Sequence, residues 1–319
     1  MKRIAVMVMA ALMLMGAGQA WATYTFTTFD YPGGDFWTHA SGINDSGDIV
    51  GGYQTSAGVE HGFLDAGGTF TSIDYPGGYG TVANGINDSG DIVGSYYDSA
   101  GVEHGFLDAG GTFTSIDYPG GYGRTVANGI NDSGDIVGSY QYDQWGSIHG
   151  FLDAGGTFTS INASYMCGAT GINDSGDIVG SYNPGWGDEL GFLDAGGTLT
   201  TFFAPGSYYT WPTGINDSGD IVGTNMDYKE EYHGFLDAGG TFTSIEEPDD
   251  PYYTFAEGIN GSGDIVGWTS DHSGHPEGYL AVPDAPVSSV PEPSTFLLLA
   301  LGLAALEAWG VKSRRGWTA

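Results

Sequence analysis

The residues best suited to bind a ligand are tryptophans and tyrosines in the parts of the chain that vary most between its repeats. Trp37 and Trp211 fall in segments between repeats, and other tryptophans fall in variable connections within them. The candidate set is Trp37, Trp145, Trp186, Trp211, Trp268, Tyr142, Tyr208, Tyr228 and Tyr252. Aromatic rings beside carboxylates bind neutral sugars by stacking and hydrogen bonding. We therefore predict a surface for neutral glycans, with packing among the loops as the alternative.

Aspartates recur in short turns whose oxygen atoms could bind a cation. The turn at residues 44–48, Asn-Asp-Ser-Gly-Asp, has oxygen ligands at the close spacing of calcium loops. It lacks the distal glutamate of an EF-hand and the nonapeptide of β-helix calcium repeats. We predict no cofactor, with Ca²⁺ at Asp45, Asp48 and Asp65 as the alternative.

The histidines do not form a catalytic set. Four of them occupy the same position in separate repeats, which keeps them apart and favours a structural hydrogen bond at a strand end. These are His61, His104, His149 and His233. A glycoside hydrolase needs only two carboxylates facing a sugar, and an acidic chain supplies such pairs by chance. We predict no catalytic residue, and a secreted polysaccharide hydrolase stays open as the alternative.

The elements that carry these residues come from an internal repeat. Gly-Ile-Asn recurs at intervals of 42 to 44 residues, starting at Gly42, Gly85, Gly129, Gly171, Gly214 and Gly258. That period is typical of four-stranded propeller blades. Within a unit, residues 69–73 alternate polar and apolar as a half-buried strand does, and residues 82–86 form a second short strand. We predict an all-β, six-bladed β-propeller of six four-stranded repeats of about 43 residues; an open solenoid is the alternative.

In a four-stranded meander, successive connections alternate between two faces. The Asn-Asp-Ser-Gly and Asp-Ala-Gly-Gly turns barely change between copies and share one face. The linkers and variable connections share the other, and loops on a rigid scaffold are where recognition usually occurs. If the Gly-Ile-Asn strand is innermost, the strand at residues 24–29 pairs with residues 278–280 and completes the last blade. This closure removes two exposed sheet edges.

The two ends of the chain have the composition of targeting segments. Lys2 and Arg3 precede an apolar run and then Ala20-Trp21-Ala22, the order of a secretory signal. We predict a signal peptide at 1–22 and the propeller at 23–282. A proline-rich linker at 283–294 leads to an apolar segment at 295–311, long enough for a transmembrane helix of about 25 Å. The basic tail at 312–319 is expected in the cytoplasm.

The C-terminal residues resemble a known sorting signal. Val290-Pro291-Glu292-Pro293-Ser294, the apolar segment and the terminal arginines are similar to the PEP-CTERM tail of Gram-negative bacteria. The resemblance implies that an exosortase-like enzyme acts at Pro291, Glu292 and Pro293, in cells that make exopolysaccharide. We expect an exported protein, first anchored in the inner membrane and then at the cell surface or outside the cell.

The repeats also resemble a bacterial extracellular family, the HAF repeat proteins. The matching pieces are Gly-Ile-Asn-Asp-x-Gly-x-Ile-Val-Gly at 42–51 and His-Gly-Phe-Leu at 61–64, with their copies. Leu190 and Glu277 replace the histidine in two units. The resemblance implies the fold and an extracellular location, and it assigns no biochemical role.

The charge of the repeat region restricts its partners. Residues 23–290 contain 37 acidic side chains and two basic ones, Arg124 and Lys229. Nucleic acid is excluded because phosphate binding needs lysine and arginine, while cations, neutral sugars and basic partners remain. We predict a non-catalytic cell-surface or matrix protein, monomeric in its repeat domain, that binds exopolysaccharide or other neutral glycans through the variable loop face.

Overall fold

A computed structural model of the chain describes residues 23–161, 167–185, 189–249, 253–270 and 274–284. Within these ranges the chain forms strands and turns and no helix, so no described helix could cross a membrane. The predicted signal segment and membrane segment, together with Trp186 and Tyr252, lie outside the described residues.

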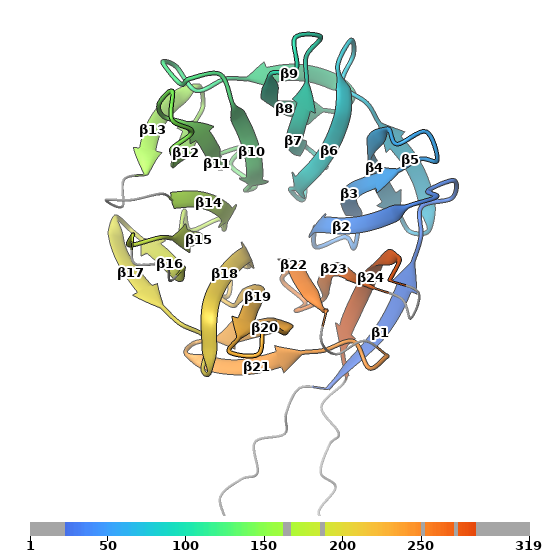
Figure 1. Cartoon of the computed structure of the whole chain (residues 1–319), viewed down its shortest axis with the longest axis vertical. Coiled ribbons are helices and arrows are strands. Elements are labelled where there is room, and N and C mark those ends of the chain that lie inside the picture. The colour runs from blue at the N-terminus through green and yellow to red at the C-terminus, as the bar shows by residue number, and fades with distance from the viewer. Residues whose placement is uncertain (1–22, 162–166, 186–188, 250–252, 271–273, 285–319) are drawn as a thin grey trace, which may run out of the picture. The chain divides into compact units, whose positions relative to one another are not determined.

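The described strands form six antiparallel sheets arranged as blades around a central channel (Figure 1). Blade 1 contains β2 (Trp37–Ile43), β3 (Ile49–Gln54), β4 (Glu60–Ala66) and β5 (Thr69–Ile73). Blade 2 contains β6 (Tyr79–Ile86), β7 (Ile92–Tyr97), β8 (Glu103–Ala109) and β9 (Thr112–Ile116), and blade 3 contains β10 (Thr125–Ile130), β11 (Ile136–Gln141), β12 (Ile148–Ala154) and β13 (Thr157–Ile161). Blade 4 contains β14 (Cys167–Ile172), β15 (Ile178–Tyr182), β16 (Leu190–Ala195) and β17 (Thr198–Phe202), and blade 5 contains β18 (Ser207–Ile215), β19 (Ile221–Asp227), β20 (Tyr232–Ala238) and β21 (Thr241–Ile245). Blade 6 contains β22 (Phe255–Ile259), β23 (Ile265–Ser270), β24 (Pro276–Pro283) and β1 (Tyr24–Phe29).

Blade 6 is built from both ends of the repeat region. Its outermost strand is β1, which pairs antiparallel with β24 so that Phe29 faces Gly278 and Thr27 faces Leu280. The innermost strands of blades 1 and 6, β2 and β22, lie against each other and complete the ring (Figure 1). The closed six-bladed propeller is therefore confirmed, and the alternative of an open solenoid is wrong.

Glycine allows the six innermost strands to approach one another around the channel. A Cβ atom on Gly42 would lie 3.2 Å from the Cα of Gly85, and one on Gly258 would lie 3.1 Å from the Cα of Gly42. A β-bulge precedes this glycine in blade 1, between Ala40 and Gly42. The repeated Gly-Ile-Asn thus marks a close backbone contact that a larger residue would prevent.

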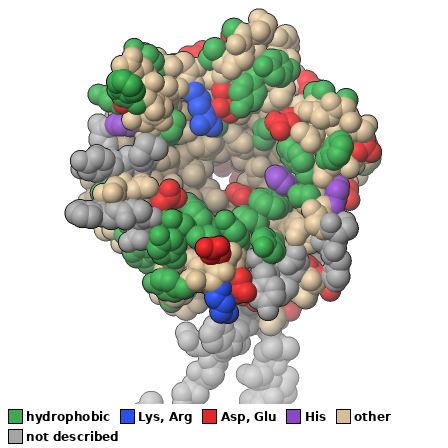
Figure 2. All heavy atoms as spheres, viewed as in Figure 1, with side chains coloured by type: hydrophobic (Ala, Val, Ile, Leu, Met, Phe, Trp, Pro, Cys, Tyr) green, Lys and Arg blue, Asp and Glu red, His purple; other side chains and the backbone are tan. Residues whose placement is uncertain are grey.

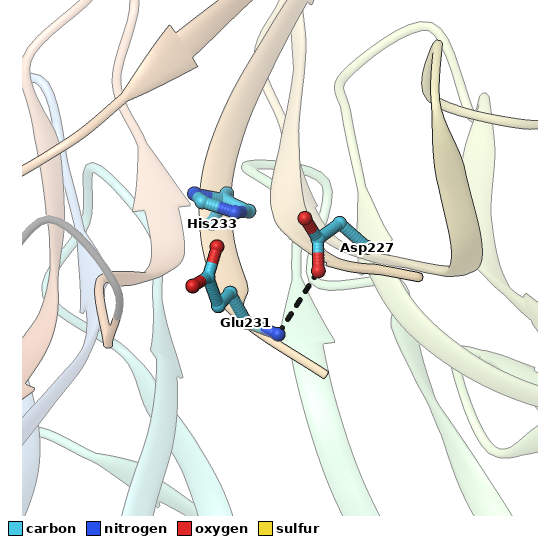
Figure 3. Close-up of side chains that lie close together, drawn as sticks. All are labelled: Asp227, Glu231 and His233. Carbon is cyan, nitrogen blue, oxygen red and sulfur yellow. Dashed lines mark hydrogen bonds between the residues drawn. The ribbon is translucent and has the colours of Figure 1, made fainter. Parts of the chain in front are cut away.

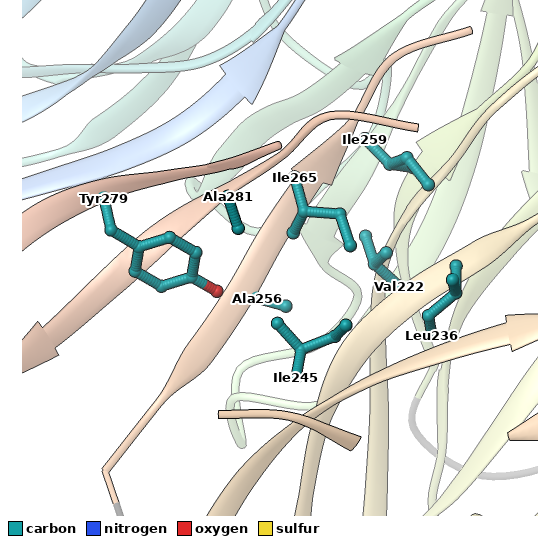
Figure 4. Packing of buried hydrophobic residues seen from close by; sticks show 8 residues of the cluster. All are labelled: Val222, Leu236, Ile245, Ala256, Ile259, Ile265, Tyr279 and Ala281. Carbon is teal, nitrogen blue, oxygen red and sulfur yellow. The ribbon is translucent and has the colours of Figure 1, made fainter. Parts of the chain in front are cut away.

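The hydrophobic core lies between successive blades. In one cluster, Val222, Leu236 and Ile245 of blade 5 pack against residues of blade 6 (Figure 4). Those of blade 6 are Ala256, Ile259, Ile265, Tyr279 and Ala281. Since each blade buries one face against the next, no blade has a complete core until the ring is closed.

The innermost strands extend further than the sequence predicts. The second strand of the repeat, expected at residues 82–86, runs as β6 from Tyr79 to Ile86. Trp37 and Trp211 consequently lie in strands rather than in linkers, and Trp268 lies in β23 rather than in a loop. Tyr208 lies in β18. The reason is backbone pairing with the neighbouring strand, which continues to Trp37 opposite Gln54 and Trp211 opposite Thr224.

Candidate functional site

We call the face of the propeller that carries the Asn-Asp-Ser-Gly turns the turn face. There the carboxylates of Asp45 and Asp65, two of the three aspartates that were candidates for calcium, accept hydrogen bonds from backbone N–H groups. Asp45 Oδ1 accepts a hydrogen bond of 2.6 Å from the N–H of Gly261, and Asp65 Oδ1 accepts one of 2.8 Å from the N–H of Gly68. The N–H of Asp48 donates to Asn44 Oδ1. Among the described residues, the group of side chains close enough to share one metal ion is Asp227, Glu231 and His233, and it does not include Asp45, Asp48 or Asp65.

The repeated histidines lie at strand ends beside carboxylates. His61 Nδ1 is 2.6 Å from Asp74 Oδ1, and His104 Nδ1 is 2.6 Å from Asp117 Oδ1. Burial lowers the pKa of His104, but the Asp117 and Asp98 carboxylates outweigh it and raise that pKa overall. The predicted structural hydrogen bond is confirmed in these two blades.

The opposite face, which carries the linkers and variable connections, we call the loop face. A continuous row of aromatic rings crosses it from blade 1 through blade 6 to blade 5, and we call this row the aromatic arc. Its members, in spatial order, are Trp37, His39, Trp268, Phe255, Tyr232, Trp211, Tyr209, Tyr208 and Tyr228. Neighbouring ring centroids lie from 3.8 Å apart at Phe255 and Trp268 to 6.1 Å apart at Trp211 and Tyr232. Figure 2 shows hydrophobic side chains gathered over the same blades.

The arc departs from the repeat. The position of His39, Trp211 and Phe255 on the innermost strand holds Val82, Val126 or Gly168 in the other blades. The position of Trp268 on the second strand holds only small residues elsewhere, namely Gly52, Ser95, Ser139, Ser181 and Thr224. Three blades therefore fold with small residues at both of these positions, and the fold alone does not require the aromatic rings.

The structure brings together only some of the predicted site residues. Trp37, Trp211, Trp268, Tyr208 and Tyr228 belong to the arc, in which Tyr228 is 79% exposed and Tyr208 37%. The arc also includes His39, Tyr209, Tyr232 and Phe255, which were not predicted. Comparing the strand positions of the repeats, rather than their loops, would have found them.

Two predicted residues lie on blade 3, away from the arc. Trp145 is 82% exposed, and Tyr142 stacks on His149 with ring centroids 4.4 Å apart. Both lie in the connection between β11 and β12. They belong to the loop face, as predicted, but they form no common surface with the arc rings.

Burial shifts the pKa of two titrating side chains in or next to the arc, His39 and Glu257, toward their neutral forms. His39 is stacked between Trp37 and Trp268, and burial lowers its pKa to about 4. Burial raises the pKa of Glu257 to about 7, against a hydrogen bond with Trp268 that lowers it. The indole N–H of Trp211 donates to a carboxylate oxygen of Glu189. This environment suits an uncharged ligand better than an ion.

A cluster of three ionisable residues lies at the loop-face end of blade 5 (Figure 3). The ligand atoms of Asp227, Glu231 and His233 all lie within 4.8 Å of one another. Asp227 accepts backbone hydrogen bonds from Glu231 and Lys229, which lower its pKa. Lys229 Nζ lies 3.5 Å from Glu231 Oε2 and competes with a cation for that carboxylate. The trio has the chemistry of a divalent metal site, but the turn itself explains its geometry.

A scan against family models identifies the C-terminal signal. Residues 289–315 match the PEP-CTERM protein-sorting motif. The predicted motif is thereby confirmed, and it indicates an exported protein with a membrane-anchored sorting tail. No protein of curated function matches the chain.

Several solved structures share the propeller fold. A triple mutant of AofleA from Arthrobotrys oligospora is 11% identical, with a TM-score of 0.51, over 81% of this chain and 86% of that one. TolB from Acinetobacter baumannii is 10% identical, with a TM-score of 0.50, over 74% of this chain and 64% of that one. A mutant of the Aleuria aurantia lectin is 14% identical, with a TM-score of 0.45, over 78% and 97%. At such identities the similarity shows the fold alone.

Proposed function

We propose that this protein is a non-catalytic protein of the cell surface or extracellular matrix that binds neutral glycans through the aromatic arc. The observation that carries this proposal is that three blades place partly exposed aromatic rings where the other blades have small residues. Aromatic faces and edges bind the apolar C–H faces of sugars, and neighbouring carboxylates and amides accept hydrogen bonds from the hydroxyl groups. Exopolysaccharide of the producing cell is the expected ligand.

The charge of the domain favours a neutral ligand. Its two basic side chains are already paired, because Arg124 Nε lies 2.5 Å from Glu103 Oε2 and Lys229 lies beside Glu231. No other lysine or arginine occurs between residues 23 and 290. A polyanionic glycan would meet uncompensated carboxylates, so neutral polymers should bind more tightly than uronic acid polymers.

The ends of the chain supply the route to the surface. The signal peptide at 1–22 directs export, and the segment at 295–311 then holds the precursor in the inner membrane. An exosortase-like enzyme acts at Pro291, Glu292 and Pro293 and releases the repeat domain to the surface or the medium. Glu307 within the apolar segment makes it a poor permanent anchor, in keeping with a temporary one.

A glycan array combined with a reducing-sugar assay tests the proposal. The full chain is applied to neutral and uronic acid polysaccharides, beside Tyr228→Ser in the arc and Trp145→Ser outside it. Both side chains are largely exposed, so neither change should disturb folding. Tyr228→Ser should weaken binding roughly 2- to 10-fold, since one aromatic contact is lost, and Trp145→Ser should not. Release of reducing sugar by the wild type would instead support the secreted hydrolase and overturn the proposal.

A further inference from the structure

Blade 5 has an open pocket of about 380 Å³ at its loop-face end. It lies between the linker that enters the blade, residues 204–206, and the ends of β19, β20 and β21. Phe235 and Phe242, with ring centroids 5.7 Å apart, form its apolar side. Residues of the arc do not line it.

The same place in blades 1, 2 and 3 is filled by two stacked tyrosine rings. Their centroids are 3.6 to 3.7 Å apart in the pairs Tyr31–Tyr53, Tyr75–Tyr96 and Tyr118–Tyr140. In blade 5 the corresponding residues are Ala204 and Asn225. The pocket is therefore the space that two phenol rings occupy in blades 1, 2 and 3.

The surroundings of the missing rings are retained. The N–H of Ala204 donates to Thr210 Oγ1 at 3.0 Å, as the N–H of Tyr31 donates to Thr38 Oγ1 at 3.0 Å in blade 1. The linker thus follows the same path in both blades. The loss of the rings has left an opening rather than a collapsed loop.

The polar groups that bind the tyrosine hydroxyl are also retained. In blade 1 the Tyr53 hydroxyl donates to Ser72 Oγ, which in turn donates to Asp74. In blade 5 Ser244 Oγ donates to Glu246 Oε1 at 2.7 Å. The residue that corresponds to Tyr53 is Asn225, which has a side-chain amide and no phenol hydroxyl group. Ser244 and Glu246 are left able to bind a hydroxyl group from a ligand.

His233 lines the pocket as well. Its Nδ1 is buried and makes no hydrogen bond with the described residues; the nearest carboxylate, Glu246 Oε1, is 3.4 Å away. A buried ring nitrogen without a hydrogen bond costs stability, and a bound hydroxyl group would remove that cost. Asp227 adds a further carboxylate at the rim.

We infer that this pocket binds one neutral pyranose ring. A ligand that replaces the tyrosine rings should share their chemistry, with a six-membered ring, apolar faces and hydroxyl groups at the edge of the ring. The apolar face would lie against Phe242, and the hydroxyl groups would bind Ser244, Glu246 and His233. Two carboxylates and no lysine or arginine line the pocket, so a uronic acid is excluded by its charge. The inference deepens the proposed function by adding a site for a single sugar unit beside the arc.

Saturation-transfer NMR and calorimetry on the full chain in detergent test this site. The probes are D-glucose, D-galactose, D-mannose, L-fucose and N-acetyl-D-glucosamine, with D-glucuronate as the charged control. At least one neutral sugar should bind and D-glucuronate should not. Replacing Ala204→Tyr and Asn225→Tyr together refills the pocket with the pair found in three other blades. Binding should fall by about tenfold or more, with no fall in the melting temperature.

Two further variants keep the test decisive. Glu246→Gln changes an exposed side chain, so it should fold normally and weaken sugar binding roughly tenfold by loss of a charged acceptor. Tyr122→Ser changes a 59% exposed side chain of blade 3 that belongs to neither the arc nor the pocket, so it should leave binding of the single sugar unchanged. The inference is overturned if no neutral sugar binds the wild type, or if sugar binds the refilled variant and Glu246→Gln as tightly as the wild type. If a single sugar binds but no polysaccharide does, the proposed function is wrong and this site stands. If polysaccharide binds but no single sugar does, this site is wrong and the proposed function stands.

Discussion

The side-chain amide of Asn260 donates a 3.2 Å hydrogen bond to the backbone carbonyl of Asn44, although 216 residues separate the two. The same bond joins every other pair of neighbouring blades at 3.1 to 3.3 Å, through Asn44, Asn87, Asn131, Asn173 and Asn216. These buried asparagines form a closed ring around the channel mouth on the turn face. The seam between the first and last blades is thus bonded like every internal seam.

Removing one bond of this ring should destabilise the propeller measurably. Asn260→Ala deletes the donor at the seam, and it also deletes the Oδ1 that accepts hydrogen bonds from the N–H groups of Ser262 and Asp264. The free energy of unfolding should therefore fall by about 1–3 kcal/mol. Asn131→Ala, at an internal seam, is the matched control and should cost a similar amount. Chemical denaturation of both variants measures this. An unchanged midpoint for Asn260→Ala would show that the seam does not depend on the ring.

Two glycines of blade 4 should respond very differently to a methyl group. A Cβ on Gly180 would lie 2.0 Å from the carbonyl oxygen of Gly168 and 2.8 Å from the ring of Phe192. Gly180→Ala should therefore lower the free energy of unfolding by about 3 kcal/mol. A Cβ on Gly168 meets no atom within 4 Å, and Gly168→Ala should change stability by less than about 0.5 kcal/mol. Equal melting temperatures for the two variants would contradict this packing.

Glu257 should make the protein less stable as the pH rises. Its pKa of about 7 in the folded state lies above the ordinary 4.5, so the folded protein holds this proton more tightly than the unfolded chain does. The stabilisation is complete below pH 4.5 and is lost as the pH rises through 7, by up to about 3 kcal/mol. Because the side chain keeps some contact with the channel, the measured value should be smaller.

Glu257→Gln removes that dependence. Between pH 4.5 and 8, the unfolding free energy of the wild type should fall relative to that of the variant. Paired denaturation curves at several pH values measure it, and other titrating groups cancel in the difference. A constant difference over this range would mean that Glu257 is not buried as the structure places it.

His39 should have the opposite effect. Its pKa of about 4 lies below the ordinary 6.5, so the folded protein binds this proton less tightly than the unfolded chain. The stabilisation is complete above pH 6.5 and is lost as the pH falls through 4. His39→Val introduces the residue that blades 2 and 3 have at this position. The melting temperature of this variant should fall less at acid pH than that of the wild type. Melting temperatures of wild type and variant from pH 7 to 4 decide the matter; parallel curves would count against it.

The sorting proposal predicts retention of an unprocessed form. Replacing Pro291 and Glu292 by alanine should trap the chain in the membrane fraction with Trp317 still attached, whereas Val287→Ala, outside the matched motif, should not. Cell fractionation with intact-mass measurement compares them. Wild-type protein that stays in the membrane with its tail intact would leave a plain tail anchor as the explanation.

Much of the architecture was already present in the sequence. The strands, the turns and the six-fold repeat follow from alternation and spacing within about 43 residues, which are local properties of the chain. The pairing of β1 with β24 also followed, because only that arrangement removes both free edges. The sorting motif is a linear signal and needs no fold to be recognised.

The tertiary structure alone decided which side chains meet. Trp37 and Trp268 come from opposite ends of the repeat region and share a surface only because the ring closes between blades 1 and 6. The pocket of blade 5 depends on Ala204 and Asn225, two small residues whose meaning appears only when the blades are superimposed in space. Periodicity specifies which residues form strands, but contacts between blades depend on register and ring closure, and these are set by packing across the whole molecule.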